Sequence, residues 1–166
     1  MNVTEMQAKV IALLSEVNRK GVDNLIQFVK DSDYLTTASC YSHHKGAYGL
    51  MAHSLEVLDV MLKDNVAGFS RESLILVALC HDLGKARLKG LKIGRGFHPI
   101  RSINILDKCG VELTEQERAA IRGHHPRGIA EYAAAAANPL QLLLHLGDSR
   151  STGLDKRGCT YRFTAV

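Results

Sequence analysis

The sequence predicts an all-α protein, a single helical bundle of about seven or eight helices. Its 166 residues include no Trp, and aromatic residues make up only 5%, so the core must be built from aliphatic side chains. A core rich in Leu and Ala favours helix over sheet. The chain has no internal repeat and no linker long enough to divide it, so residues 1–166 are expected to form one domain.

Apolar residues recur with helical spacing over the first half of the chain. Helices are expected over residues 4–20, 22–29, 50–62 and 70–81. Gly21 is a natural stop for the first of them, because glycine readily adopts the backbone conformations that end a helix. Ser70 is expected to begin the fourth, which runs through the apolar stretch SLILVALC into His81.

Start signals for helices are clearest in the second half of the chain. Thr114 and Glu117 have the spacing of a capping box, and Pro99 suits the first turn of a helix. Helices are expected over residues 99–108, 114–122, 128–137 and 140–148. The Gly-bearing, basic segment 85–96 is expected to be a loop, with room for a small hairpin. The polar tail after Ser149 is expected to be either loosely ordered or a short strand.

The net charge and the cysteines exclude few classes of protein. The formal net charge of +4 is compatible with an anionic substrate but does not by itself indicate nucleic-acid binding. No apolar run approaches the length of a membrane span, and the N-terminal segment lacks the layout of a signal peptide. The four scattered cysteines form no CxxC pair and are expected to be reduced thiols: Cys40, Cys80, Cys109 and Cys159. We therefore expect a cytoplasmic protein without membrane contacts.

The stretch CHDLGK ends the most apolar predicted helix with adjacent His and Asp residues, His81 and Asp82. Gly84 gives the chain the freedom to turn there, and a cationic Lys85 follows. Neutral imidazole and carboxylate groups suit divalent ions such as Mn, Fe, Co, Ni or Zn. Further candidate ligands occur at the ends or on the faces of other predicted helices: His53, His98, His124, His125 and Asp148. A helical bundle can bring such side chains into one interior pocket.

Each of these signals is weak when taken alone. A single His such as His53 is more often an ordinary core or surface residue than a ligand, and an HD dipeptide occurs by chance. The complete ordered set indicates a metal site. Asp82 carries two oxygens and could bridge two ions, and two ions a few ångströms apart can clamp a phosphoryl group.

Three segments together resemble the HD-domain superfamily of metal-dependent phosphohydrolases. They are HHKGAYGLMAHSLEV at 43–57, HDLGK at 81–85 and LLLHLGDSRST at 142–152, so the motif-bearing core covers residues 43–152. The order H…HD…D, with the added His98 and His124–His125, resembles the binuclear branch of that superfamily. The first segment is similar to the HD domains of 3′-to-5′ exoribonucleases and of plasmid-transfer proteins.

The resemblance implies a role for each candidate. One divalent ion would be held by four residues: His53, His81, Asp82 and Asp148. Asp82 would bridge to a second ion, which His98 and His124, His125 or both would also hold. Lys85 would act in catalysis by contacting a substrate phosphate. Three arginines are weaker candidates for phosphate binding: Arg101, Arg127 and Arg150.

The implied activity is hydrolysis of a phosphomonoester or phosphodiester through a metal-bridged hydroxide. The expected substrate is a phosphorylated small molecule or nucleotide, or a nucleic-acid end. The choice between phosphatase and phosphodiesterase stays open, because the chain has neither an oligonucleotide-binding barrel nor a GYP signature. Two other functions also stay open: a non-catalytic nucleotide- or partner-binding module with a structural metal, and a di-iron oxygenase.

Three further histidines have alternative interpretations. His43 and His44 either line the entrance of the pocket and bind substrate, or belong to a polar loop. His145 lies three residues before Asp148, on nearly the same helix face. It either orients a ligand or is simply a partly buried histidine. No segment predicts an oligomer interface.

Overall fold

The computed structural model describes residues 2–39, 44, 46–90, 97–126 and 129–157. This part of the chain contains no strand, so the predicted all-α class is confirmed. Its helices are α1 (Val3–Ser15), α2 (Val22–Asp31), α3 (Gly49–Lys63), α4 (Arg71–Cys80), α5 (His98–Cys109), α6 (Glu115–Gly123), α7 (Ile129–Ala137) and α8 (Pro139–Arg157). Two short 3₁₀ helices, η1 (Asp33–Leu35) and η2 (Leu83–Lys85), complete the set.

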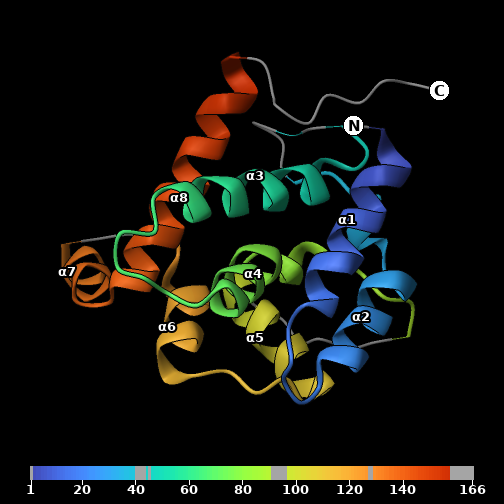
Figure 1. The fold of residues 1–166 in the computed structure, drawn as a ribbon, viewed down its shortest axis with the longest axis horizontal. Coiled ribbons are helices and arrows are strands. Elements are labelled where there is room, and N and C mark those ends of the chain that lie inside the picture. The colour runs from blue at the N-terminus through green and yellow to red at the C-terminus, as the bar shows by residue number, and fades with distance from the viewer. Residues whose placement is uncertain (1, 40–43, 45, 91–96, 127–128, 158–166) are drawn as a thin grey trace.

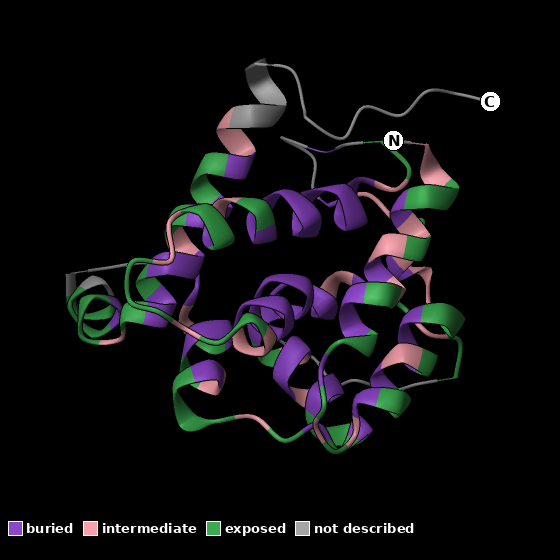
Figure 2. Cartoon of the chain, viewed as in Figure 1, coloured by how far each residue is buried: buried purple, intermediate pink, exposed green. Residues whose placement is uncertain are grey.

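Helix α4 lies at the centre of the bundle, and its residues from Leu74 to Cys80 are buried. Figure 1 shows α3 passing over it, with α1 and α2 on one side and α6, α7 and α8 on the other. Helix α3 packs against both α4 and α8, and its first ten residues are all buried. In Figure 2 most of both helices is coloured as buried, and their exposed residues lie near the C-terminal end of α3 and at the N-terminal end of α4. The two helices that carry the first candidate ligands are therefore held rigidly in the core.

The predicted helix starts are confirmed by their hydrogen bonds. The Ser70 hydroxyl accepts a hydrogen bond from the Ser73 N–H, which caps α4. Thr114 and Glu117 form the capping box of α6, with distances of 3.2 and 2.8 Å between the paired atoms. Pro99 lies in the first turn of α5. These starts were predictable because they depend on side chains only a few residues apart.

Two helix ends, those of α1 and α8, differ from the prediction by more than two residues. Helix α1 ends at Ser15 instead of residue 20. The chain leaves the helix there because the Asn18 N–H donates to Glu72, at 3.1 Å, and the Arg19 guanidinium donates to Glu117, at 2.6 Å. These contacts link the segment after α1 to the starts of α4 and α6.

The expectation of a tail after Ser149 is wrong over residues 149–157, which continue α8. Ser151 explains this difference, since its side chain is fully buried against α3 and keeps the helix in register beyond Asp148. The end of the chain, residues 158–166, lies outside the described residues, as do residues 91–96 of the predicted loop. The start of that loop forms η2.

The described cysteines, Cys80 and Cys109, are free, as expected, and both are buried. Cys40 and Cys159 lie outside the described residues.

Within the described part of the chain, none of the helices combines the length and the apolar character needed to cross a bilayer.

Candidate metal centre

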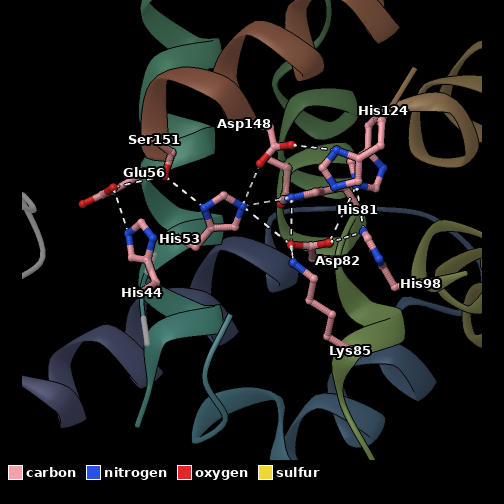
Figure 3. A network of polar contacts seen from close by, with 12 residues as sticks. His44, His53, Glu56, His81, Asp82, Lys85, His98, His124, Asp148 and Ser151 are labelled. Atoms are coloured by element: carbon pink, nitrogen blue, oxygen red, sulfur yellow. Dashed lines mark hydrogen bonds and ion pairs between the residues drawn. The ribbon is translucent and has the colours of Figure 1, made fainter. Parts of the chain in front are cut away.

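His53 points from the buried face of α3 toward the end of α4 (Figure 3). Its ring is fully buried, and both ring nitrogens have partners. Nδ1 lies 3.0 Å from the Ser151 hydroxyl, while Nε2 lies 3.1 Å from Asp148 Oδ1 and 3.3 Å from His81 Nε2. The helices α3, α4 and α8 therefore meet at this imidazole.

His81 and His124 are oriented by the same kind of hydrogen bond. Each is the C-cap residue of its helix, and its Nδ1 bonds to the carbonyl three residues earlier, at 2.8 Å for Ala78 and 2.7 Å for Ile121. Carbonyls at the end of a helix lack intrahelical partners and accept such a bond readily. Since Nδ1 must donate there, Nε2 is the nitrogen of each ring that faces the cluster.

Asp82 lies between two groups of ligand atoms, the position predicted for a bridging carboxylate. One oxygen, Oδ2, lies 3.4 Å from His81 Nε2 and 3.6 Å from His53 Nε2. The other, Oδ1, lies 3.0 Å from His98 Nε2 and 3.7 Å from His124 Nε2. The backbone of Asp82 has left the α-helical conformation, which allows it and His81 to point into the same space.

The two groups are compact enough to hold one ion each. The first group consists of His53, His81 and Asp82, and the second of Asp82, His98, His124 and His125. The donor atoms within each group all lie within 4.8 Å of one another. Asp148 touches both groups, because its Oδ1 contacts His53 and its Oδ2 lies 3.5 Å from His125 Nδ1.

The surroundings of five cluster residues favour the protonation state that metal binding requires. Burial lowers the pKa of His53 and of His124, and it lowers the pKa of His125 to about 4. Burial would raise the pKa of Asp82 and of Asp148, but the neighbouring imidazoles outweigh it and hold both below their usual range. Neutral imidazoles and ionised carboxylates are the forms that ligate metal ions.

His81 is the exception, because the adjacent Asp82 outweighs burial and raises the pKa of His81. A proton on His81 Nε2 would be donated to His53 Nε2, 3.3 Å away. Two bare nitrogen lone pairs at that distance repel one another, so a cation must lie between them, either a proton or a metal ion. Asp82 Oδ1, though buried, accepts no well-aligned hydrogen bond from the described residues. The donor set and this oxygen both fit divalent ions.

Lys85 brings positive charge to the cluster, and Arg101 lies three residues after the candidate ligand His98 on α5. The Lys85 ammonium lies 2.5 Å from Asp82 Oδ2 and is partly exposed. Arg101 lies on α5, with its Cβ close to Gly84, and its Nε is buried without a hydrogen-bond partner in the described part of the chain. A buried guanidinium N–H without a partner can serve an anion, since leaving it unpaired is costly.

Three of the remaining predicted residues belong to the described part of the chain: Arg150, His145 and His44. Arg150 pairs with Asp64, just beyond the end of α3 that is remote from His53. Arg127 and His43 lie outside the described residues. His145 is partly buried, and its Nδ1 lies 3.1 Å from the carbonyl oxygen of His124, so it contacts a candidate ligand through the backbone. His44 lies in the non-helical segment before α3, and its ring is buried against Glu56.

Sequence reasoning missed the residues that support the ligands: Glu56, Ser102 and Ser151. The Ser102 hydroxyl accepts the Gly84 N–H and lies 2.8 Å from the His81 carbonyl, so it ties the turn after α4 to α5. Ser151 follows Asp148 by three residues, and Glu56 follows His53 by three. A polar residue one helical turn after a candidate ligand was the sequence signal that could have identified Glu56 and Ser151.

A cavity of about 520 Å³ opens beside His125, between α5, α6 and α7. Its wall is largely apolar and includes Phe97, Ile100 and Ala134, while Arg122 and Glu131 contribute polar groups. The Phe97 ring lies 4.7 Å from that of His98, measured between centroids. Cavities of this size hold small organic ligands.

Comparisons of the chain with models of known protein families, with curated proteins and with solved structures gave no match. Membership of the HD-domain superfamily therefore remains a prediction from the three motifs. The geometry of the ligand cluster is the basis for inferring a function.

Proposed function

We propose that this chain is a metal-dependent phosphohydrolase of the HD-domain type, which binds two divalent transition-metal ions. One observation carries the proposal: buried imidazole Nε2 atoms from α3, α4 and α6 converge on the two oxygens of Asp82. A charged carboxylate surrounded by histidines in a bundle interior is costly unless it serves a cation. The order of these residues along the chain also matches the HD motifs.

Each residue has a distinct task in the proposed reaction. His53, His81 and Asp82 would hold one ion, and Asp82, His98, His124 and His125 the other. Two ions held there would supply Lewis acidity, activating a water and neutralising charge on the phosphoryl group. Lys85 would leave Asp82 Oδ2, 2.5 Å away, to neutralise a phosphate oxygen. Arg101 would use its unpaired Nε to orient the same group.

The cavity beside His125 supports an organic phosphate as substrate rather than a small inorganic one. A phosphoryl group at the second ligand group would place its ester substituent next to this cavity, because His125 belongs to both. Its apolar wall and volume suit a ring system, as in a nucleotide. The net charge of +4 favours such an anion.

The free cysteines, Cys80 and Cys109, support a reducing compartment such as the cytoplasm.

The test combines elemental analysis with an activity assay on one sample. Protein purified without chelator is analysed for metal and assayed with Mn²⁺ on bis-p-nitrophenyl phosphate, p-nitrophenyl phosphate and a set of nucleotides. About two ions per chain with hydrolysis of any of these esters is the expected result. Ions without turnover would overturn the enzymatic proposal in favour of a binding module, and absence of ions after reconstitution would overturn the metal centre itself.

A further inference from the structure

Helix α3 buries a carboxylate, Glu56, that the proposed mechanism does not use. The side chain is 1% exposed and lies one helical turn after His53. An ionised carboxylate in such a position is stable only if it accepts hydrogen bonds. Glu56 Oε2 accepts one from the Ser151 hydroxyl, at 3.1 Å, and lies 3.2 Å from His44 Nε2.

The hydrogen bonds around Glu56 can run in only one direction. A carboxylate has no proton to give, so the Ser151 hydroxyl must donate to it. The Ser151 oxygen is then free to accept, and the group facing it, at 3.0 Å, is His53 Nδ1. His53 must therefore donate from Nδ1. A neutral His53 then has a bare Nε2 beside the Asp148 carboxylate and His81 Nε2, and this arrangement needs a cation between the three groups (Figure 3).

Helix geometry explains why these four groups meet. His53 and Glu56 are three residues apart on α3, and Asp148 and Ser151 are three residues apart on α8, so each pair lies on one helix face. Gly147 lets the two helices approach closely, because a Cβ at this position would lie 3.3 Å from Val57 Cγ1. The facing turns of α3 and α8 therefore place a polar partner at each ring nitrogen of His53.

His44 closes the outer end of this arrangement. Its backbone is in the left-handed region, with φ of 47°, and its carbonyl accepts the Ser39 N–H. The same carbonyl lies against Gly49, where a Cβ would approach it to 1.9 Å. The ring is therefore fixed over Glu56 by backbone contacts, which keeps the carboxylate oriented toward Ser151.

We propose that Ser151 and Glu56 are positioning residues that hold His53 in the tautomer with a bare Nε2 and so set the metal affinity of the first ligand group. The inference rests on the metal site of the proposed function but not on its hydrolytic activity. Hydrogen-bond partners of ligating histidines contribute about 10- to 100-fold to metal affinity in other sites.

The test compares Ser151→Ala with Ser54→Ala, a buried serine next to His53 that lies outside the chain of hydrogen bonds. Competition between the full chain and a chromophoric chelator measures the affinity for Zn²⁺. Two-bond ¹H–¹⁵N spectra of the metal-free protein report the tautomer of His53, whose signals are assigned by their loss in His53→Gln. We expect a fall in affinity of about 10- to 100-fold and loss of the single Nδ1–H tautomer for Ser151→Ala only.

Two Glu56 variants separate positioning from simple packing. Glu56→Gln keeps an oxygen that can accept from Ser151, so it should retain the tautomer. Glu56→Met has similar bulk but no strong acceptor, so the Ser151 hydroxyl becomes free to donate to His53 Nδ1 and the proton should move to Nε2. These variants keep the Ser151 hydroxyl, so they test the same link if Ser151→Ala fails to fold.

The outcomes distinguish this inference from the proposed function. If the protein binds Zn²⁺ but hydrolyses nothing, a weakened Ser151→Ala still supports the positioning role. If Ser151→Ala and Glu56→Met keep wild-type affinity and the Nδ1–H tautomer, the positioning role is wrong even when the enzyme is active. If the wild type shows His53 protonated on Nε2 alone, the inferred direction of the hydrogen bonds is wrong.

Discussion

Asp148 lies between His53 and His125 and contacts each with a different oxygen, at 3.1 and 3.5 Å. The motif resemblance assigned Asp148 to the first ion alone. Because Asp148 also contacts His125, it links the two ligand groups, as Asp82 does. A change in either carboxylate should therefore affect both ions, whereas a change in His98 should first affect the second.

Asp82→Asn should abolish binding of both ions. The substitution keeps the size of the side chain but removes the charge that faces His81 and His98. We expect metal content to fall from about two ions per chain to near zero, with turnover lost. Asp107→Asn is the control, because Asp107 is an exposed carboxylate paired with Arg118. Retention of both ions by Asp82→Asn would contradict the bridging role.

Lys85→Ala should spare metal binding and impair turnover. The ammonium contacts Asp82 from the partly exposed side and is not a metal ligand, so its removal leaves the donor set intact. Loss of one charge that stabilises a transition state lowers kcat by about 100-fold. The control is Lys89→Ala, an exposed lysine four residues later. Loss of metal from Lys85→Ala would show that the ammonium organises Asp82 instead of acting on substrate.

Gly84→Ala should disturb the second ligand group. A Cβ at Gly84 would lie 2.2 Å from the His98 carbonyl oxygen and 2.8 Å from the Ser102 N, so the first turn of α5 must move. Because His98 begins that turn, we expect metal content to fall from about two ions per chain to about one. Overpacking should also cost about 1 to 3 kcal/mol in the free energy of unfolding.

Gly46→Ala is the matched control, since no atom lies within 4 Å of the Cβ built there. Both variants are analysed by elemental analysis and by urea denaturation. Two ions per chain in Gly84→Ala would mean that α5 can shift without moving His98 out of ligand distance.

Glu117→Gln should destabilise the fold in a pH-dependent manner. Burial would raise the pKa of Glu117, but the hydrogen bond from Arg19 and the contact with Thr114 outweigh it and lower the pKa. The resulting stabilisation is fully present above the unfolded value near 4.5 and is lost as the pH falls through the lower folded pKa. Breaking this buried pair should cost about 2 to 3 kcal/mol at neutral pH.

Urea denaturation of wild type and Glu117→Gln at neutral and acidic pH measures this difference. Glu115→Gln, an exposed acid in the same helical turn, is the control and should cost little at either pH. A difference between wild type and Glu117→Gln that stays constant as the pH falls would show that the charge of Glu117 does not stabilise the fold.

Local patterns predicted much of this protein because they act over a few residues. Helical spacing predicted the all-α class, and the side chains of Ser70 and Thr114 predicted where α4 and α6 begin. The identities and order of His53, the His81–Asp82 pair and Asp148 predicted a metal site, and the structure brings these residues together. Residue type and spacing sufficed for these predictions, since ligand chemistry belongs to the side chain itself.

Tertiary packing decided what depends on distant parts of the chain. Helix α8 continues past Asp148 because Ser151 packs against α3, and no pattern near residue 149 indicates this. The same contact determines which nitrogen of His53 carries the proton. Both features require two segments about a hundred residues apart to meet at hydrogen-bond distance. A sequence pattern identifies which groups are able to bond, but only the packing of α3 against α8 selects the partners.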